Sequence, residues 1–480
     1  MNNNKVYIAG LKFMLVNAVK RLYNGEVFFK HSLDKGIHAT IEAETKITKT
    51  ELKKIKSYMK KMVKDNIPFN RKVVSKQEAY DFFVKKGHLE KADNILTVQN
   101  LTVTLYEFEG QYNYFYSEMP ESTGELDLFD LYYVTENELV LVYPTNGEIV
   151  FEFRKKIYDL FKDTDDWNKK IGIDYVMDVN EMMAQGKIAD VIRKQNIMVN
   201  QNLYDIARDI HDKKKKIILI AGPSCSGKTT TSKKMSLYLS SLGLNALPIS
   251  LDDFFVDRGD TPLDENGKPD YECLEALDLK LFNSTLQKLL DGKEVKIPRF
   301  NFLTGKKEYD DSRYCIGEND VLVIEGLHAI NPKLLKLKDQ SMCYKLYISP
   351  LTPLSVDRHN YVSTTDNRLL RRIVRDFRTR GRSCEASLAT WASVRRGEEK
   401  HIFPYTDTCD AMLNTAYVYE LGVLKVYVEP LLRNVKMDSE FYYEARRLLD
   451  NLQTFFTVPS ENVDDENLLR EFIGGSRFEE

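Results

Sequence analysis

Residues 222–230 form the segment best suited to bind phosphate. They read G-P-S-C-S-G-K-T-T and follow an apolar run, Ile217–Ala221, that is typical of a buried strand. Glycines let several backbone N–H groups point at phosphate oxygens, and the start of a following helix adds its positive dipole end. Lys228 would supply charge for the outer phosphates, and Thr229 would ligate magnesium. This Walker A pattern predicts a nucleotide site made of Gly222, Pro223, Ser224, Cys225, Ser226, Gly227, Lys228, Thr229 and Thr230.

Carboxylates follow two further apolar runs. The run LPISL leads into Asp252 and Asp253, where we expect a second strand to end, and VLVIE ends in Glu325. Because the carboxyl ends of parallel strands meet at one edge of a sheet, these side chains should face the phosphate loop. Phosphoryl transfer needs one carboxylate for the acceptor hydroxyl and another that organises magnesium. Asp252 is therefore the expected base, with Asp253 as the alternative, and Glu325 is expected to hold magnesium through water.

Arginines are concentrated in the segment NRLLRRIVRDFRTRGRS. The segment contains one acidic residue, Asp376, and seven arginines: Arg368, Arg371, Arg372, Arg375, Arg378, Arg380 and Arg382. Forked guanidinium groups suit phosphate better than lysines do. A helix would place the first four on one broad face, and Gly381 would form a hinge. The segment is predicted to be a lid over the phosphates, with a basic solvated helix as the alternative.

Composition excludes several classes of protein. The 480 residues are 43% hydrophobic and 29% charged with a net charge of −3, which excludes wholesale disorder and a global positive field. No guanine-reading Asn-Lys-x-Asp string and no LSGGQ-like segment follows the loop, which favours a small-molecule kinase over a GTPase or a transporter ATPase. The six cysteines form no C-x-x-C pair, so a zinc ribbon or disulfide framework is not expected. No membrane-spanning run is present in the sequence, and we expect a cytoplasmic protein.

The elements that would position these residues differ between the two halves of the chain. After residue 216, strands alternate with helices, which predicts an α/β kinase fold with a doubly wound parallel sheet covered on both faces. The first 150 residues predict an α+β domain, with an amphipathic helix over 48–66 and strands in LTVTLYEF, YNYFYSE and ELVLVYP. We expect domains at 1–150 and 216–432, a helical connector at 151–215 and a helical tail at 433–480.

Charge is divided sharply within the first of these domains. Residues 1–100 contain 20 basic and 10 acidic side chains, whereas residues 101–150 contain no basic and 10 acidic ones, so the two parts are expected to face each other. The lysine-rich face of the helix over 48–66 is more typical of a solvated surface than of an RNA-binding one. Nucleic acid is therefore not an expected partner.

The ordered motifs of the second half resemble the phosphoribulokinase/uridine kinase family over residues 216–426. They comprise the Walker A loop, S-x-D-x-F, IPRFNF, EGL, the arginine segment and HIFPYTDTCDAMLN. The resemblance implies that ATP and Mg²⁺ are the cofactors, that Asp252 is the base and that Glu325 is associated with magnesium. It further implies phosphate contacts from Arg375 and Arg380, nucleoside contacts from Arg372 and Arg382, and ribose contacts from Glu272.

Three positions depart from the uridine kinase pattern and leave the acceptor open. Phe300 and Gly305 stand where uridine kinases have a tyrosine and a histidine near the pyrimidine, and Thr390 stands where they have a base-contacting glutamine. The lost hydrogen bond to histidine would forfeit about 1–3 kcal/mol of recognition. The acceptor is thus expected to be a nucleoside or, alternatively, a non-nucleoside sugar alcohol. A further alternative is an RNA-associated regulatory protein whose phosphate loop gates binding.

The first 150 residues resemble the second additional domain of threonyl-tRNA synthetases, most clearly in LVNAVKRLY and ELKKIKSYMKKMVKDNIPFNRKVVSKQEAYDFF. In that family the domain edits mischarged tRNA with two histidines in an H-x-x-x-H string and a later cysteine and histidine. The corresponding positions are Ala9, Phe13, Phe115 and Met119, none of which can bind zinc or act as an acid or base. We expect the domain to have lost hydrolysis and to serve as a scaffold, a homo-oligomer surface or a sensor of a small ligand.

Overall fold

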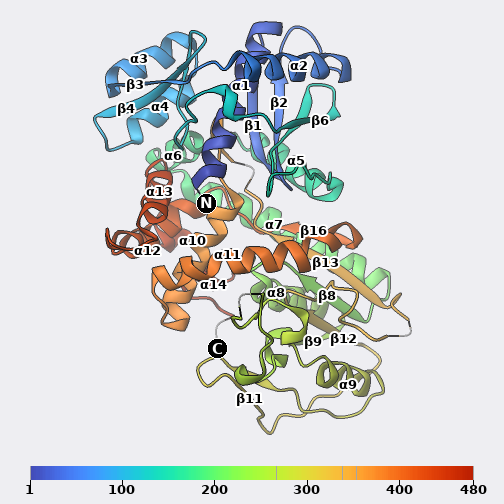
Figure 1. Cartoon of the computed structure of the whole chain (residues 1–480). Helices are drawn as coiled ribbons and strands as arrows, with labels where there is room; N and C mark the ends of the chain where they lie inside the picture. The colour runs from blue at the N-terminus through green and yellow to red at the C-terminus, as the bar shows by residue number, and fades with distance from the viewer. Residues whose placement is uncertain (1, 266, 338, 353, 479–480) are drawn as a thin grey trace. The chain divides into compact units, whose positions relative to one another are not determined.

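The computed structural model describes residues 2–265, 267–337, 339–352 and 354–478. They form two compact units, coloured along the chain in Figure 1, and each unit is assembled from separate stretches of sequence. The first unit contains residues up to Ile188, Thr352–Asn367 and Val418–Pro459, and the second contains Ala189–Leu351, Arg368–Tyr417 and the residues from Ser460 onwards. The two units are defined by contacts between residues, whereas the sequence analysis divides the chain into four consecutive segments. That division into four segments stays a prediction.

The first unit is built on a four-stranded antiparallel sheet in the order β1-β2-β7-β6. Its strands are β1 (Glu26–Leu33), β2 (Gly36–Glu42), β6 (Asp130–Thr135) and β7 (Glu138–Val142). Helices α1 (Asn2–Tyr23) and α2 (Lys49–Asp65) pack together beside it (Figure 1). Helix α2 confirms the amphipathic helix expected there, because Thr48 caps its first turn and its buried side chains are Leu52, Ile55, Met59 and Met62.

A second sheet of the first unit has the order β3-β4-β5 and carries helices α3 and α4. The expected strands in LTVTLYEF and ELVLVYP are confirmed as β4 and β7, whereas only the first two residues of YNYFYSE belong to β5. The remaining elements of the unit are β3 (Asn70–Ser75), α3 (Lys76–Lys86), α4 (Leu89–Thr97), β4 (Thr102–Phe108), β5 (Gln111–Asn113), α5 (Lys155–Lys170), α6 (Val176–Ala184), the hairpin of β14 (Ser355–Asp357) and β15 (Asn360–Tyr361), α12 (Glu420–Arg433) and α13 (Tyr442–Gln453).

The second unit contains a five-stranded parallel sheet in the order β16-β13-β8-β12-β9. All five residues of β8 are buried, and those on one face pack against Phe282, Leu286 and Leu289 of α9. This sheet confirms the expected α/β fold. The elements of the second unit are α7 (Ile188–Asp212) from Ala189 onwards, β8 (Ile217–Ala221), α8 (Lys228–Ser241), β9 (Asn245–Ser250), α9 (Leu279–Leu290), β10 (Arg299–Asn301), β11 (Lys306–Glu308), β12 (Asp320–Glu325), β13 (Cys343–Ser349), α10 (Thr364–Arg380) from Arg368 onwards, α11 (Cys384–His401), β16 (Ala411–Asn414) and α14 (Arg470–Ile473).

The second strand of this unit ends earlier than the sequence suggests. Strand β9 stops at Ser250, and Asp252 lies in the single 3₁₀ turn Leu251–Phe254 that follows. The Ser250 hydroxyl accepts a hydrogen bond from the Asp252 backbone amide and so caps this turn. Across the described residues, no helix combines the length and apolar character needed to cross a membrane.

Candidate nucleotide and phosphoryl-acceptor site

A cavity of about 1260 Å³ lies in the second unit, and its wall includes the residues that directly follow β8, β9 and β12. Most of the site residues predicted from the sequence line it: Ser224, Cys225, Ser226, Gly227, Lys228, Thr229, Thr230, Asp252, Glu272, Phe300, Glu325, Arg372, Arg375, Arg380 and Arg382. Gly222 and Pro223 lie beside them, since Lys228 Nζ donates hydrogen bonds to both of their carbonyl oxygens, at 3.1 and 3.2 Å.

Glycines let the Walker loop turn tightly between β8 and α8. A side chain at Gly222 would place its Cβ 2.3 Å from the Ile348 carbonyl oxygen of β13, so no larger residue fits there. Gly227 has a φ of +86° and caps the start of α8. The first hydrogen bond within the helix runs from the Thr231 amide to the Gly227 carbonyl oxygen. The amides of residues 228–230 precede that bond and point to the helix start, where an anion is favoured.

Two of the arginines expected on a broad anion-binding face instead support the loop. Arg368 and Arg371 are buried, and they donate hydrogen bonds to the carbonyl oxygens of Ser224 and Cys225 at 3.0 and 3.3 Å. The buried Glu398 pairs with Arg368 and accepts a hydrogen bond from the Ser224 amide at 2.9 Å. This network holds the loop backbone from outside the cavity.

Three other arginines of α10 surround one buried carboxylate, Asp376. Its oxygens lie 2.9 Å from Arg375, 3.4 Å from Arg372 and 3.6 Å from Arg380, and all three arginines line the cavity. Burial lowers the pKa of Arg380 to about 10, and repulsion from Arg375 adds to the effect. The carboxylate therefore gathers three guanidinium groups that would otherwise repel one another.

Glu325 and Thr229 meet at the end of the loop. The Thr229 hydroxyl donates a hydrogen bond to Glu325 Oε1 at 3.3 Å, and the Ser250 hydroxyl donates to the same oxygen at 2.9 Å. Burial raises the pKa of Glu325 to about 7, and repulsion from Asp252 acts in the same direction. A hydroxyl and a carboxylate oxygen are the hard ligands that Mg²⁺ prefers, so these residues fit that ion.

The two neighbouring aspartates have different surroundings. Asp253 Oδ1 accepts a hydrogen bond from the Phe300 amide at 3.1 Å, and burial raises the pKa of Asp253. Asp252 lines the cavity together with Lys228 and Glu325. Of the pair, Asp252 is thus the carboxylate that lines the cavity, while Asp253 binds the backbone of β10.

The cavity wall also contains aromatic side chains and a further carboxylate. Phe300 packs edge-on against Phe255 and Phe302, with ring centroids 5.7 and 5.3 Å apart. Glu272 also lies here, and burial together with repulsion from Glu398 raises the pKa of its carboxyl to about 7. A carboxyl group that lines the cavity can bind hydroxyl groups of a sugar.

Of the positions that depart from the uridine kinase pattern, Phe300 and Thr390 line the cavity, and Gly305 lies beside Arg258, which lines it. Gly305 has a φ of +71°, and a Cβ there would come within 2.8 Å of the Arg258 side chain. Arg258 lines the cavity and donates a hydrogen bond to the Phe302 carbonyl oxygen at 2.6 Å. A histidine at position 305 would therefore collide with this arginine. Thr390 accepts a hydrogen bond from Arg372 at 3.4 Å, and it therefore helps to position an arginine that lines the cavity.

The cavity wall also contains residues from the end of the chain. Glu471, Ser476 and Phe478 line it beside Thr230 and Lys233. They could not be predicted from the sequence, because no motif in the tail marks a nucleotide contact. Only the folded chain brings this segment to the Walker loop.

In the first unit, the four positions that the sequence resemblance predicts to correspond to editing residues have apolar side chains. Phe13 and Phe115 have ring centroids 5.7 Å apart, Ala9 is buried, and Met119 packs against the same core. Lys12 is buried among Phe29, Phe115 and Tyr361, at 5.0, 5.1 and 5.7 Å from their ring centroids. Burial lowers the pKa of Lys12 to about 7.

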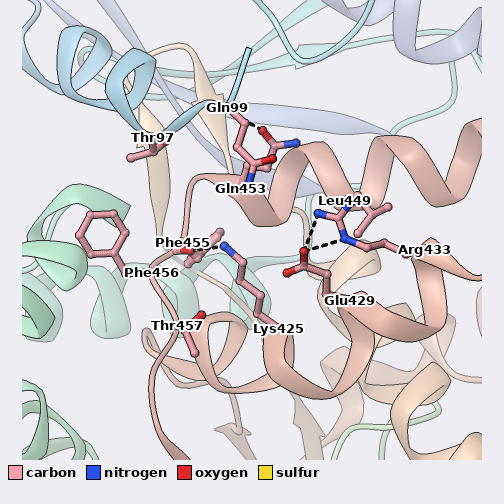
Figure 2. A pocket seen from close by; sticks show the side chains of 10 residues that line it. All are labelled: Thr97, Gln99, Lys425, Glu429, Arg433, Leu449, Gln453, Phe455, Phe456 and Thr457. Atoms are coloured by element: carbon pink, nitrogen blue, oxygen red, sulfur yellow. Dashed lines mark hydrogen bonds and ion pairs between the residues drawn. The ribbon is translucent and has the colours of Figure 1, made fainter. Parts of the chain in front are cut away.

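A smaller pocket of about 290 Å³ in the first unit is lined by residues of α12, α13 and the segments that follow α4 and α13 (Figure 2). Its charged groups bind close neighbours: Lys425 donates to the Phe455 carbonyl oxygen at 2.7 Å, and Arg433 makes two hydrogen bonds with Glu429. These contacts account for the charges of the pocket, and its residues match none of the expected site residues.

Comparison with known proteins gives consistent relatives for the second unit. The family model described as phosphoribulokinase/uridine kinase family matches residues 217–420. The uridine kinase of Halobacterium salinarum is 30% identical over 196 residues, which cover 40% of this chain and 77% of that protein. The uridine kinase of Staphylococcus aureus is 29% identical over 180 residues, covering 38% and 77%.

Among solved structures, the D-glycerate 3-kinase from Cryptococcus neoformans aligns with a TM-score of 0.25 at 16% identity, over 56% of this chain and 90% of that one. The family match and the relatives identify an ATP-dependent P-loop kinase in the second half of the sequence. The chain belongs to the phosphoribulokinase/uridine kinase family.

Proposed function

We propose that this kinase transfers the γ-phosphoryl group of ATP to a hydroxyl group of a nucleoside. The observation that carries the proposal is that the Walker loop, Asp252 and the arginines around Asp376 line one cavity. A triphosphate on the loop would therefore lie between a carboxylate that can accept a proton and guanidinium groups that can stabilise charge.

In this mechanism the loop amides and Lys228 hold the β- and γ-phosphates, while Arg375 and Arg380 stabilise the negative charge of the transferring group. Asp252 accepts the proton of the acceptor hydroxyl as its oxygen bonds to the γ-phosphorus. The bond from that phosphorus to the β–γ bridging oxygen breaks in the same displacement, and ADP leaves. Thr229 and Glu325 would hold Mg²⁺, which supplies further positive charge at the phosphates when bound.

At the acceptor end, Glu272 would bind the ribose hydroxyls, and Phe300 with Arg372 and Arg382 would surround the base. A second candidate acceptor is a non-nucleoside sugar alcohol. This acceptor is favoured because Gly305 stands where uridine kinases have a histidine near the base. The side chain beside Gly305 that lines the cavity is an arginine, Arg258. Arginine binds hydroxyl and anionic groups without selecting a pyrimidine.

The deciding experiment is an acceptor panel assayed with labelled ATP, using the wild-type protein, Asp252→Asn and Asp253→Asn in parallel. We expect Asp252→Asn to bind ATP normally and to lose transfer by about a hundredfold or more, because general-base catalysis contributes about 10²–10⁴-fold. Asp253→Asn should keep most of its turnover. Near-normal turnover by Asp252→Asn would mean that another group is the base.

We further propose that the first 150 residues are a degenerate synthetase-like domain without hydrolytic activity. Its support is the apolar filling around Phe13 and Phe115. The full chain should not deacylate mischarged tRNA faster than the spontaneous rate. Steeply salt-dependent tRNA binding without kinase activity would favour the RNA-associated alternative instead.

A further inference from the structure

The C-terminal segment places a carboxylate at the start of the Walker helix. The Thr230 amide donates a hydrogen bond to Glu471 Oε2 at 3.3 Å, and the Thr230 hydroxyl donates to the same oxygen at 2.9 Å. Thr230 is one of the residues whose amides precede the first hydrogen bond within α8. Glu471 therefore uses a donor that would otherwise be offered to a phosphate.

Glu471 also lies near a positive group that would suit a phosphate, Arg375. Burial opposes the charge of Arg375, yet the pKa of Arg375 is raised because nearby groups, including Asp376 and Glu471, attract it. Glu325, on the other side, is repelled by Glu471. The carboxylate thus lies between the helix start and an arginine that is expected to bind phosphate.

The backbone that carries Glu471 is firmly held, so only its side chain is positioned to move. Leu468, Leu469 and Phe472 are fully buried, and the Arg371 guanidinium lies 4.9 Å from the centroid of the Phe472 ring. Arg470 stabilises the fold of this C-terminal segment, because it donates hydrogen bonds to the carbonyl oxygens of Ser460, Val463 and Gly474. The Glu471 side chain itself is only half-buried.

The same segment is tied to α8 on the side of the cavity. Lys234 donates a hydrogen bond to the Glu466 carbonyl oxygen at 3.2 Å, and Lys233 donates to the Phe478 carbonyl oxygen. Leu468 lies 3.8 Å from the position that a Cβ at Gly227 would take. The segment is therefore part of the nucleotide cavity, although it lies outside the region, residues 217–420, that the family model matches.

We propose that Glu471 is a built-in competitor for the phosphates of ATP and sets the affinity of the enzyme for its phosphate donor. The inference rests on the proposed binding of ATP at the Walker loop. When a triphosphate binds, the Glu471 side chain must give up the Thr230 amide, because two anions cannot share it without strong repulsion. Glu471 is then a determinant of donor affinity rather than a catalytic residue.

The test compares Glu471→Gln with Glu466→Gln in the full chain. Glu466 belongs to the same segment, but its side chain pairs with Arg477 at 3.2 Å. Equilibrium binding of ATP, inorganic tripolyphosphate and adenosine is measured for both variants and the wild type, and unfolding temperatures check that each variant is folded. We expect Glu471→Gln to lower the Kd of ATP and of tripolyphosphate about tenfold, with adenosine unchanged. Glu466→Gln should change none of the three.

An unchanged or weaker affinity of Glu471→Gln for both phosphate ligands would overturn the inference, and so would an equal gain in Glu466→Gln. Weaker adenosine binding without a gain for tripolyphosphate would instead mean that Glu471 binds the nucleoside, which also overturns it. Lys228→Ala reports on the proposed function separately. If ATP binds this variant as tightly as the wild type, the donor does not use the Walker loop, whatever Glu471→Gln does.

Discussion

At the scale of single residues, Asp376 is buried and is the carboxylate that pairs with three arginines of the cavity wall. Removing a buried partner leaves uncompensated charge, so Asp376→Ala should lower the free energy of unfolding by about 3–5 kcal/mol. Added inorganic phosphate should raise the unfolding temperature of this variant more than that of the wild type, because the anion can take the place of the carboxylate.

Thermal unfolding with and without phosphate checks this expectation. Asp311→Ala is the matched control, since Asp311 is fully exposed and its pair with Lys296 lies at the surface. An equal response to phosphate in Asp376→Ala and the wild type would show that the arginines do not form an anion site.

Glu325 should make stability depend on pH. Its pKa is raised to about 7 by burial, above the ordinary value of 4.5 expected in the unfolded chain. The folded state therefore binds the proton more tightly, and this contribution is full below pH 4.5 and is lost as the pH rises through 7. Between pH 5 and 8 the wild type should lose up to about 3 kcal/mol of stability that Glu325→Gln does not lose.

Urea denaturation of both proteins at pH 5 and pH 8 measures this difference. Glu272, whose pKa is raised in the same direction, is present in both proteins and cancels in the comparison. If the free energy of unfolding changed equally between pH 5 and pH 8 in the wild type and in Glu325→Gln, the result would contradict the raised pKa of Glu325.

At the scale of elements, the geometry of the Walker loop depends on how closely it approaches β13. In Gly222→Ala the new methyl group would lie 2.3 Å from the Ile348 carbonyl oxygen, so the loop or the strand must shift. We expect a loss of about 1–3 kcal/mol in stability, together with much weaker ATP binding. Gly259→Ala is the control, because a Cβ there meets nothing within 4 Å. Calorimetric ATP titration of both variants would reveal whether the loop tolerates the change.

Elements with a strong local pattern could be predicted from the sequence. Helix α2 follows from the spacing of Leu52, Ile55, Met59 and Met62, and β8 and β12 follow from apolar runs beside a glycine loop and a glutamate. The role of Glu471 could not be predicted, because its partner Thr230 is 241 residues away and no local pattern marks the contact. The burial of Arg368 and Arg371 was missed for a related reason: periodicity identifies a helix face but not what covers it.

At the scale of the whole molecule, each unit depends on residues from distant parts of the sequence. Lys91 and Asp357 form a fully buried ion pair at 2.8 Å within the first unit. A fragment of residues 1–215 lacks Asp357 and the hairpin that packs on α4, so Lys91 loses its partner and part of its cover, and breaking such a buried pair costs about 3–5 kcal/mol. We expect the fragment to be much less stable than the full chain.

Replacement of the lysine should have opposite effects in the two contexts. Lys91→Met should stabilise the fragment of residues 1–215, because it removes the unpaired charge, and should destabilise the full chain, because it leaves Asp357 buried alone. Circular dichroism and urea denaturation of the four proteins test this reversal. The same sign in both contexts would mean that the pair contributes little to the first unit.

The hairpin of β14 and β15 lies inside the stretch of sequence that matches the kinase family, yet it belongs to the first unit. A gene that lost its 5′ half would thus encode a chain that keeps this hairpin but lacks the rest of the first unit. A gene that lost its 3′ half would encode a first unit without Asp357. Any rearrangement that separated the two halves of the sequence would therefore also separate this hairpin from the unit to which it belongs.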